Sequence, residues 1–276
     1  MTEWILSLLS KRVNRQYQRS RPNNSLFSGL LLCFDYSLFF LTHVILLELP
    51  KHVAYIVDGN GRWASRLANS TDSRIDRSFG HTVGANVTVN IVKKTFELGV
   101  SFVTVFLFST ENWSRPSQEV QNIIHLLDKY LIDFSAYLKK EKIQLRVIGQ
   151  KNRFPLHTQH LLDTVGYQSD SSLEQGTESR RILCLALSYG GRDDIVDSCR
   201  LLASLAANGK ISPNEIDEQM FAKYTQLGRS GIPDPDLLVR TSGERRLSNF
   251  LLWNCAYTEF ESVPCLCENQ IILKNQ

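Results

Sequence analysis

The chain has 276 residues, of which 43% are hydrophobic and 21% are charged. These values are ordinary for globular proteins, so collagen-like, low-complexity and fully disordered classes are excluded. The chain is long enough to bury a core without disulfides or a structural metal. Its six cysteines form no C-x-x-C pair, which argues against a zinc site and is typical of an intracellular protein.

The formal net charge of +3 is too small to indicate a protein that binds nucleic acid. Residues 1–50 hold five of the 31 basic and three of the 28 acidic residues. The body from residue 51 is therefore nearly neutral, and any cationic site within it must be a local cluster.

Residues 1–50 form a leader in which a basic stretch, 11–21, precedes a mostly apolar stretch, 25–49. The apolar stretch is long enough for a membrane helix, although Asp35 near its middle costs about 2.5–3.5 kcal/mol. A cleaved signal peptide fits poorly because no small-residue cleavage site follows. We expect a membrane anchor or interfacial helix; an organelle-targeting leader and an unreliable chain start remain open.

The body, residues 51–276, alternates strand and helix patterns and is expected to form one domain. Apolar, β-rich runs predict five strands at His52–Val57, Phe102–Phe108, Ile143–Ile148, Ile182–Ser188 and Leu237–Arg240. Apolar spacing, Pro116, Gly99 and Asn208-Gly209 predict helices at Val83–Leu98, Gln118–Lys139 and Arg192–Ala207. This alternation predicts an α/β fold with a mainly parallel sheet flanked by helices.

Three further segments carry local signals. Ser212–Glu215 reads as a capping box with proline at the first helical position, which predicts a helix start. The polar segments Leu67–Asp76 and Tyr167–Ser179 are expected to be surface loops.

In parallel sheets the functional site lies at the carboxyl ends of the strands, so the segments that follow each strand matter most. Four of them combine arginine, small residues and a carboxylate: Asp58–Trp63, Ser109–Pro116, Tyr189–Asp193 and Arg240–Asn249.

The first of these segments reads Asp58-Gly59-Asn60-Gly61-Arg62. Glycines between a strand and a helix let backbone N–H groups approach an anion. The planar guanidinium of Arg62 adds paired N–H donors that suit phosphate oxygens. Asp58 could hold Mg²⁺ that also touches the phosphate. The segment is neither a Walker loop nor a dinucleotide fingerprint, and an ordinary tight turn remains an open alternative.

The last of these segments places Arg240, Arg245, Arg246 and Ser248 within nine residues and suggests a second anionic group. The alternative is a solvated loop in which Glu244 pairs with a neighbouring arginine. Arg77 and His81 could complete the first anion site. Two anion pockets, one carboxylate and long apolar helices suggest a diphosphate with an apolar tail. A phosphate-binding hydrolase would need a nucleophile or water-activating base at a strand end, and no convincing candidate exists.

Five ordered runs resemble the signature blocks of cis-prenyltransferases, the undecaprenyl and dehydrodolichyl diphosphate synthases. They are HVAYIVDGNGRWA, FGHTVGA, FLFSTENWSRP, YGGRDDIV and DPDLLVRTSGERRLSNFLLW, spanning His52 to about Glu259. The resemblance implies a single α/β domain with a six-stranded, mainly parallel sheet. It also implies addition of isopentenyl diphosphate to an allylic primer such as farnesyl diphosphate, with Mg²⁺ as cofactor.

The resemblance also assigns roles. The catalytic residues it implies are Asp58, His81 and Asn112. Mg²⁺ would be held by Asp58 and Glu259. The allylic diphosphate would be held by Gly59, Asn60, Gly61 and Arg62, helped by Arg77 and His81, with Trp63 near the primer. The site would be lined by Ser109, Thr110, Glu111, Asn112 and Trp113, and Arg115 would support the same region. The isopentenyl diphosphate site would comprise Arg240, Arg246, Leu247 and Ser248.

The partners implied are a second copy or a related subunit and a membrane-associated product, most simply at the endoplasmic reticulum. The segment after Glu259 lacks the family's Trp-Pro-Asp-Phe-like block and its Arg-x-Gly segment. This departure leaves an alternative to the enzyme, a non-catalytic or partner-dependent subunit of a prenyltransferase complex. Intact Asp58 and the arginines argue against that alternative.

Overall fold

The structure of the chain is a computed structural model that describes residues 49–62, 64, 77–171 and 180–264. Residues 1–48 of the leader and the segment Leu67–Asp76 lie outside the described residues, so the predictions for them, and the division of the chain at residue 50, stay predictions. Within the described residues no helix combines the length and hydrophobicity needed to cross a bilayer.

The six strands form one sheet in the order β3-β4-β2-β1-β5-β6, and every neighbouring pair is parallel. Their bounds are β1 His52–Ile56, β2 Phe102–Ser109, β3 Ile143–Ile148, β4 Arg181–Tyr189, β5 Leu237–Arg240 and β6 Glu259–Ser262. The predicted α/β fold with a parallel sheet is confirmed, and the five strands predicted from local pattern lie within one or two residues of their positions.

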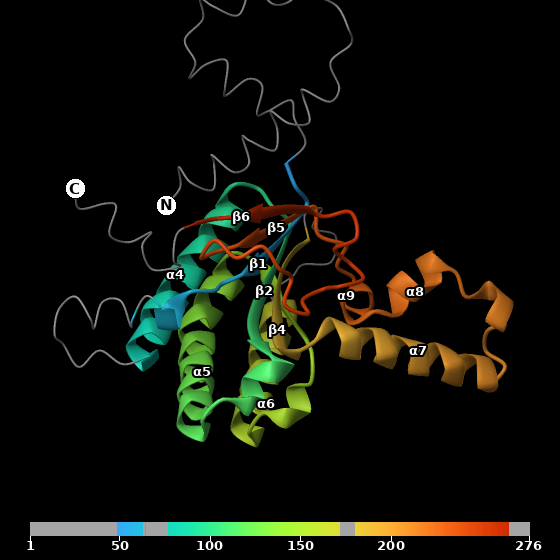
Figure 1. Ribbon diagram of the computed structural model, residues 1–276, viewed down its shortest axis with the longest axis horizontal. Helices are drawn as coiled ribbons and strands as arrows, with labels where there is room; N and C mark the ends of the chain where they lie inside the picture. Colours follow the sequence, from blue (N-terminus) through green and yellow to red (C-terminus); the bar gives the residue numbers. More distant parts are fainter. Residues whose placement is uncertain (1–48, 63, 65–76, 172–179, 265–276) are drawn as a thin grey trace, which may run out of the picture. The chain divides into compact units, whose positions relative to one another are not determined.

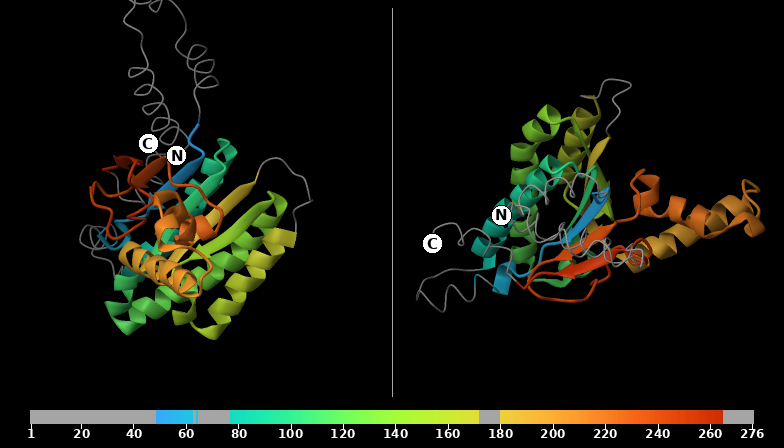
Figure 2. Two further views of the ribbon diagram at one scale, coloured as in Figure 1. Left: turned by 90° about the vertical axis from the view of Figure 1, so that its right-hand side faces the viewer. Right: turned by 90° about the horizontal axis from the view of Figure 1, so that it is seen from above.

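Helices cover both faces of the sheet, as the views in Figures 1 and 2 show. One face carries α4 (Arg77–Glu97), α5 (Ser117–Lys140) and α6 (Leu156–Ser171). On the other side α9 (Gln226–Arg229) and the beginning of α7 (Gly191–Ala207) lie next to the sheet, while the rest of α7 and α8 (Glu218–Tyr224) project away from it. Short 3₁₀ turns lie at η1 (Thr110–Ser114), η2 (Lys151–Arg153) and η3 (Pro213–Glu215).

Three local predictions are corrected by the structure. Helix α4 begins at Arg77, six residues before the predicted start. Residues 167–171, the first five of the stretch expected to be a loop, are helical because α6 extends to Ser171; residues 172–179 lie outside the described residues. The capping box at Ser212 forms, but it opens only the turn η3; α8 has its own N-cap, Asp217, whose carboxylate accepts the Met220 N–H at 2.7 Å.

The sheet is buried because its strands are apolar on both faces, as a sheet covered on both sides requires. All five residues of β1 and all four of β5 are buried, and so are eight of the nine residues of β4. Phe250, Leu251 and Leu227 close the core on the side of α7–α9.

His52 is the one strongly polar residue of β1, and its ring is fully satisfied inside the core. Nδ1 lies 2.7 Å from the Pro233 carbonyl and Nε2 lies 2.8 Å from the Thr104 hydroxyl. Burial lowers the pKa of His52 to about 4. The imidazole is therefore neutral: Nδ1–H donates to Pro233 and Nε2 accepts from Thr104.

This burial predicts a loss of stability as the pH falls. Between pH 6.5 and about 4 the unfolded chain binds a proton at His52 that the folded chain excludes, so acid favours unfolding. From pH 7 to pH 5 the free energy of unfolding should fall by about 2 kcal/mol more in the wild type than in His52→Asn. Urea unfolding at the two pH values measures this difference.

The matched control is His160→Gln, since His160 is exposed on α6. It should keep the full pH dependence of the wild type. Equal pH dependence in the wild type and in His52→Asn would contradict the neutral, buried state of His52.

Candidate functional site

The carboxyl ends of four adjacent strands meet at one edge of the sheet. Register pairs Ile56 of β1 with Phe106 of β2 and with Arg240 of β5, and it pairs Ser109 with Tyr189. The four segments that follow these strands, which are the four singled out in the sequence, therefore lie side by side, as expected of a parallel sheet.

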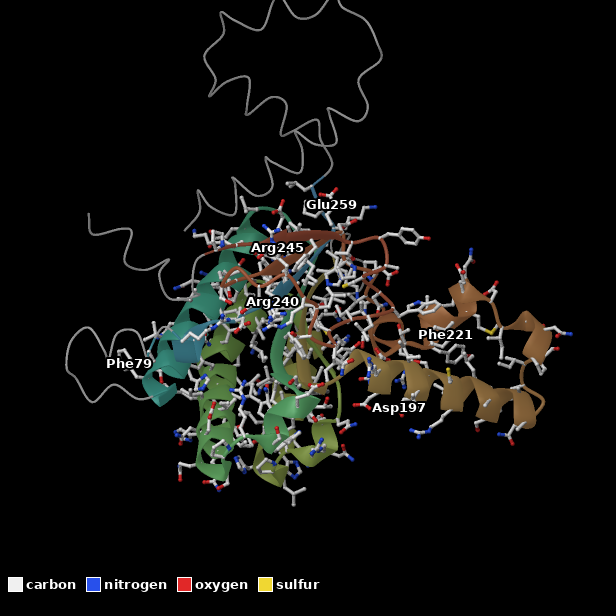
Figure 3. The ribbon with its side chains drawn as sticks, in the orientation of Figure 1. Phe79, Asp197, Phe221, Arg240, Arg245 and Glu259 are labelled. Atoms are coloured by element: carbon white, nitrogen blue, oxygen red, sulfur yellow. The ribbon has the colours of Figure 1, made fainter. Side chains whose placement is uncertain are left out.

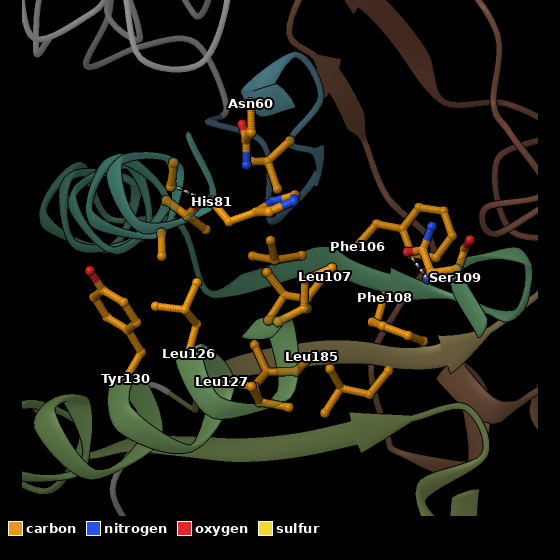
Figure 4. Close-up of a pocket in the computed structure, with 18 of the residues that line it drawn as sticks. Asn60, His81, Phe106, Leu107, Phe108, Ser109, Leu126, Leu127, Tyr130 and Leu185 are labelled. Atoms are coloured by element: carbon orange, nitrogen blue, oxygen red, sulfur yellow. Dashed lines mark hydrogen bonds between the residues drawn. The ribbon is translucent and has the colours of Figure 1, made fainter. Parts of the chain in front are cut away.

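A cavity of ≈ 890 Å³ opens at this edge and runs between the sheet and helices α4 and α5. Its polar lining comes from the segments after the strands and from the first turns of the two helices: Asp58, Asn60, Arg62, His81, Ser109, Glu111, Asn112, Arg115, Glu119, Arg240, Ser248 and Asn249. Figure 4 shows Asn60 and His81 entering from the upper side and Leu127 and Leu185 facing them from α5 and β4.

The interior of the cavity is apolar and follows the length of α5. Lining positions recur about one turn apart along α5, at Glu119, Ile123, Leu127, Leu131, Phe134 and Leu138. Nineteen residues of helix span about 28 Å. On the sheet side Phe106, Leu107 and Phe108 all line the cavity, and the register of β2 shifts between Phe106 and Phe108. The cavity thus has a polar mouth and a long apolar interior.

At the mouth, Asp58 and Arg240 form a partly buried ion pair. Arg240 Nη2 donates to Asp58 Oδ2 at 2.8 Å, and the Arg240 side chain is only 4% exposed. Nη1 of Arg240 donates to the Ser248 hydroxyl at 2.8 Å and to the Arg246 carbonyl. Partial burial raises the pKa of Asp58, but the hydrogen bonds and charges of Arg240 and Arg62 outweigh it and hold the pKa below its usual range. Asp58 is therefore an ionised carboxylate.

The Thr241 hydroxyl makes two hydrogen bonds to the backbone of Asp58. Its hydroxyl oxygen accepts the Asp58 N–H at 2.8 Å, and its O–H donates to the Asp58 carbonyl at 2.6 Å. Gly59, at φ 107, turns the chain so that its N–H donates to Asp58 Oδ1 at 2.7 Å. A residue with a side chain disfavours this left-handed conformation, which explains the glycine after Asp58.

Arg62 is held by carboxylates of two segments. Its Nη2 lies 3.1 Å from Asp58 Oδ1, and its Nη1 donates to Glu244 Oε1 at 2.7 Å. The other oxygen of Glu244 accepts from Arg246 Nη1 at 2.5 Å. Glu244 thus bridges an arginine of the first segment and an arginine of the last, and hydrogen bonds from Arg62 and Arg246 lower its pKa.

Helix α4 meets the first segment through two glycines one turn apart. A Cβ atom at Gly80 would lie 2.4 Å from the Asn60 carbonyl oxygen, and one at Gly84 would lie 2.3 Å from Asn60 Nδ2. Both positions must lack a side chain for Asn60–Arg62 to reach the helix. His81, between them, lines the cavity with Nε2 3.4 Å from Glu119 Oε1, which also accepts from Arg115 Nη1 at 2.9 Å.

The turn η1 presents Glu111 and Asn112 to the cavity. Asn112 Oδ1 accepts the Ser109 N–H at 2.9 Å, which fixes the orientation of its amide. Trp113 lies outside the cavity lining: it packs edge-on against Phe108 and Phe154, and its Nε1 donates to the Ser188 hydroxyl at 2.9 Å. Trp113 anchors the turn that carries Asn112.

The structure brings most of the residues predicted for the site together, with clear exceptions. Thr110, Trp113, Arg246, Leu247 and Glu259 do not line the cavity; the Arg246 side chain is 61% exposed, and Leu247 packs on the core. Trp63 and the Arg77 side chain lie outside the described residues.

Glu259 lies far from Asp58 within the chain. It pairs in register with Leu237, at the beginning of β5, whereas Asp58 follows the end of β1. Three residues of strand place Glu259 about 10 Å back from Arg240 along the sheet, and Figure 3 shows the two residues apart. One chain therefore does not bring the two predicted metal ligands together.

Sequence reasoning missed three contributors. Glu119 lies in the first turn of α5, and the amphipathic pattern of that helix concealed its role. Thr241 directly follows Arg240, and the rule on strand ends could have found it. Asn249 lines the cavity and contacts two other segments.

Three comparisons bear on this site. The model of a family described as "Putative undecaprenyl diphosphate synthase" matches residues 56–268. An isoprenyl transferase of Bacillus cereus is 42% identical over 212 residues, covering 77% of this chain and 77% of that protein. An isoprenyl transferase of Bacillus subtilis is 40% identical over 213 residues, covering 77% of this chain and 76% of that protein.

A solved structure is also similar. The lavandulyl diphosphate synthase of Lavandula x intermedia, in complex with dimethylallyl diphosphate, is 31% identical and superposes with a TM-score of 0.73. The match covers 82% of this chain and 92% of that chain.

The two glycines of α4, Gly80 and Gly84, give a test of whether the segment Asn60–Arg62 binds an anion. Gly80→Ala should weaken the binding of inorganic pyrophosphate about 10-fold, because a displaced Asn60–Arg62 segment loses roughly one charge-assisted hydrogen bond. Isothermal titration calorimetry measures the affinity.

Gly166→Ala in α6 is the matched control, since the nearest atom to its added Cβ would be the Leu145 carbonyl oxygen at 3.9 Å. It should leave pyrophosphate binding unchanged and stabilise the helix by about 0.5–1 kcal/mol. Unchanged binding in Gly80→Ala would show that Asn60–Arg62 holds no anion.

Proposed function

Because the chain belongs to the cis-prenyltransferase family, we propose that the cavity mouth holds two diphosphates and the apolar interior receives the growing chain. The protein is an isoprenyl transferase, a cis-polyprenyl diphosphate synthase that condenses isopentenyl diphosphate onto an allylic primer. The observation that carries the proposal is the two-part cavity, with an arginine-rich mouth that continues into an apolar interior along α5.

The first diphosphate lies, in this proposal, against Asn60–Arg62. Backbone N–H groups at a strand-to-helix junction and the Arg62 fork suit a phosphate. Arg62 is already charged and oriented by Asp58 and Glu244. The oxygens of an incoming diphosphate would replace these carboxylates as hydrogen-bond acceptors of Arg62. The guanidinium would therefore need little change of position to bind the substrate. As the allylic C–O bond breaks, Arg62 stabilises the departing negative charge.

The family implies a divalent metal, and the donors at the mouth fit Mg²⁺. That ion is typically held by one or two carboxylates together with substrate phosphates and water. Asp58 is an ionised oxygen donor at the cavity wall, next to the proposed diphosphate. Bound there, Mg²⁺ would neutralise charge on the diphosphate as it departs. Within the described residues no cluster of three metal-binding side chains exists.

The second diphosphate, of isopentenyl diphosphate, is assigned to Arg240 and Ser248, with Arg246 at the rim. Holding both substrates at one mouth aligns the double bond of isopentenyl diphosphate with the allylic carbon, which converts a bimolecular step into an oriented one. Asn112, oriented by Ser109, faces the same cavity and is the proposed helper in proton removal.

The apolar interior accommodates the tail of the allylic substrate as it grows. Apolar surface of α5 and the sheet removes the tail from water, which stabilises the bound intermediate between additions. The membrane association of the product, the endoplasmic reticulum as its location, the organelle-targeted alternative and assembly with a second copy or a related subunit are further parts of the proposal. The resemblance and the apolar product support them.

The assay that tests the function uses farnesyl diphosphate, labelled isopentenyl diphosphate and Mg²⁺, followed by extraction of labelled lipid. The wild type should make long polyprenyl products, and chelation of the metal should stop it. Asp58→Asn should lower kcat by about 10³-fold or more, because it removes charge at the metal and leaves Arg240 without its counterion.

Asp197→Asn, an exposed change on α7 (Figure 3), is the control and should keep full activity. Absence of labelled product from the wild type, alone and with a related subunit, would refute the enzyme. A kcat of Asp58→Asn close to that of the wild type would refute the role of Asp58 as a metal ligand.

A second prediction concerns the interior. Leu131→Trp should shorten the products while leaving the first condensation within about twofold, because Leu131 is buried and lines the cavity well beyond the mouth. Chromatography of the dephosphorylated products measures their length. Ile132→Trp, next to it on α5 but 59% exposed, should leave product length unchanged. Products of equal length from the two variants would show that the growing prenyl chain does not lie along this part of the cavity.

A further inference from the structure

We propose that Asn249 is a positioning residue that couples the segment holding the second diphosphate to the turn that carries Asn112. The inference rests on the proposed function and gives a role to a residue to which neither the sequence motifs nor that function assign one. It begins from the position of Asn249, which directly follows Ser248 and lines the cavity.

Asn249 makes hydrogen bonds to two other segments of the site. Its Oδ1 accepts the Arg192 N–H at 2.9 Å, and its carbonyl accepts the Gly191 N–H at 2.6 Å. Its Nδ2 donates to Glu111 Oε1 at 3.1 Å. One side chain therefore links the segment after β5 to the N-terminus of α7 and to η1.

Gly190, the N-cap of α7, and Gly191, its first residue, make room for this link. A Cβ atom at Gly190 would lie 2.8 Å from Asn249 Nδ2 and 2.9 Å from the Thr110 hydroxyl oxygen. A Cβ atom at Gly191 would lie 3.1 Å from the Asn249 carbonyl oxygen and 2.9 Å from the Leu252 N. The two glycines that follow Tyr189 are thus explained by the close approach of Asn249 and Leu252.

The backbone around Asn249 is held in an uncommon conformation. Ser248, Asn249 and Leu251 have φ values of 50, 63 and 42. Such left-handed residues cost free energy, least for asparagine, and persist only where the surroundings fix them. The fully buried Phe250 supplies that anchor, since it stacks on Phe106 with ring centroids 4.5 Å apart. The segment is preorganised, and Asn249 sets its distance from η1.

The direction of the hydrogen bond to Glu111 follows from charge. Desolvation raises the pKa of Glu111, but hydrogen bonds from its own backbone N–H, Ser109, Asn249 and Thr110 together lower it. Glu111 is therefore an ionised acceptor and Asn249 the donor. An aspartate at position 249 keeps the acceptor for the Arg192 N–H but turns a carboxylate toward Glu111.

The consequence for the reaction concerns alignment rather than affinity for the primer. Ser248 and Arg240 hold isopentenyl diphosphate, and Asn112 follows Glu111 in η1. If the hydrogen bond between Asn249 and Glu111 is lost, bound isopentenyl diphosphate shifts relative to Asn112. The proton that must be removed from it shifts with it. Displacements of about 1 Å cost about 10²-fold in rate. Asn249→Asp should therefore lower kcat by about that factor and leave KM for farnesyl diphosphate within about twofold.

Reversing the polarity of the hydrogen bond tests the link itself. Glu111→Gln alone should be mild, about fivefold or less, because the new amide still offers Asn249 an oxygen. In the double variant Asn249→Asp, Glu111→Gln, the amide at 111 donates to the carboxylate at 249. It should recover at least about 10-fold of kcat relative to Asn249→Asp, a non-additivity expected only of contacting residues.

Two controls separate this inference from the proposed function. Product formation by the wild type tests the function alone. Hydrogen exchange of the Thr110–Ser114 amides, measured without substrate, tests the coupling alone: it should rise in Asn249→Asp and return in the double variant. Asn152→Asp, an exposed change in η2, should alter neither measurement. The proposal would be overturned if the losses of kcat in the two single variants simply added in the double variant. It would also be overturned if Asn249→Asp left the hydrogen exchange of the Thr110–Ser114 amides unchanged.

Discussion

The ion pair between Asp58 and Arg240 is the interaction on which the site depends. The two residues lie at the ends of neighbouring parallel strands, and a guanidinium that is only 4% exposed faces a carboxylate at 2.8 Å. A buried charge that loses its partner costs about 3–5 kcal/mol, so the pair fixes the segments after β1 and β5 together. Thr241 adds two hydrogen bonds at the same point. From this junction one segment leads to Asn60–Arg62 and the other to Ser248 and Asn249.

In the proposed function, the pair also lets a nearly neutral body bind two diphosphates. Arg62, Arg240 and Arg246 are each oriented by Asp58 or Glu244, so the protein supplies its own counterions at the mouth. Substrates that exchange with these carboxylates meet donors already in place, which is the arrangement expected of electrostatic preorganisation. In the proposed function, the long apolar interior binds the prenyl tail and the polar mouth binds the diphosphates.

Local pattern predicted most of the fold, because apolar runs and helical spacing report burial directly. It missed β6, a short strand of partly exposed residues, and it read the polar end of α6 as a loop. The rule on strand ends found the four segments of the site. It could not find Glu119 or the role of Asn249, because both depend on contacts between segments far apart in sequence. It also could not show that Glu259 lies at the opposite end of β5 from Arg240, since register is a property of the assembled sheet.

The central claim is that diphosphates occupy the mouth at Asp58 and Arg240 while the prenyl tail lies between α4, α5 and the sheet. A crystal structure with Mg²⁺, an unreactive thio analogue of farnesyl diphosphate and isopentenyl diphosphate tests it most directly. We expect the allylic diphosphate at Asn60–Arg62, the second diphosphate at Arg240 and Ser248, and the tail along Ile123 and Leu127. A diphosphate bound away from Asp58 and Arg240, or a tail lying outside this cavity, would contradict the account.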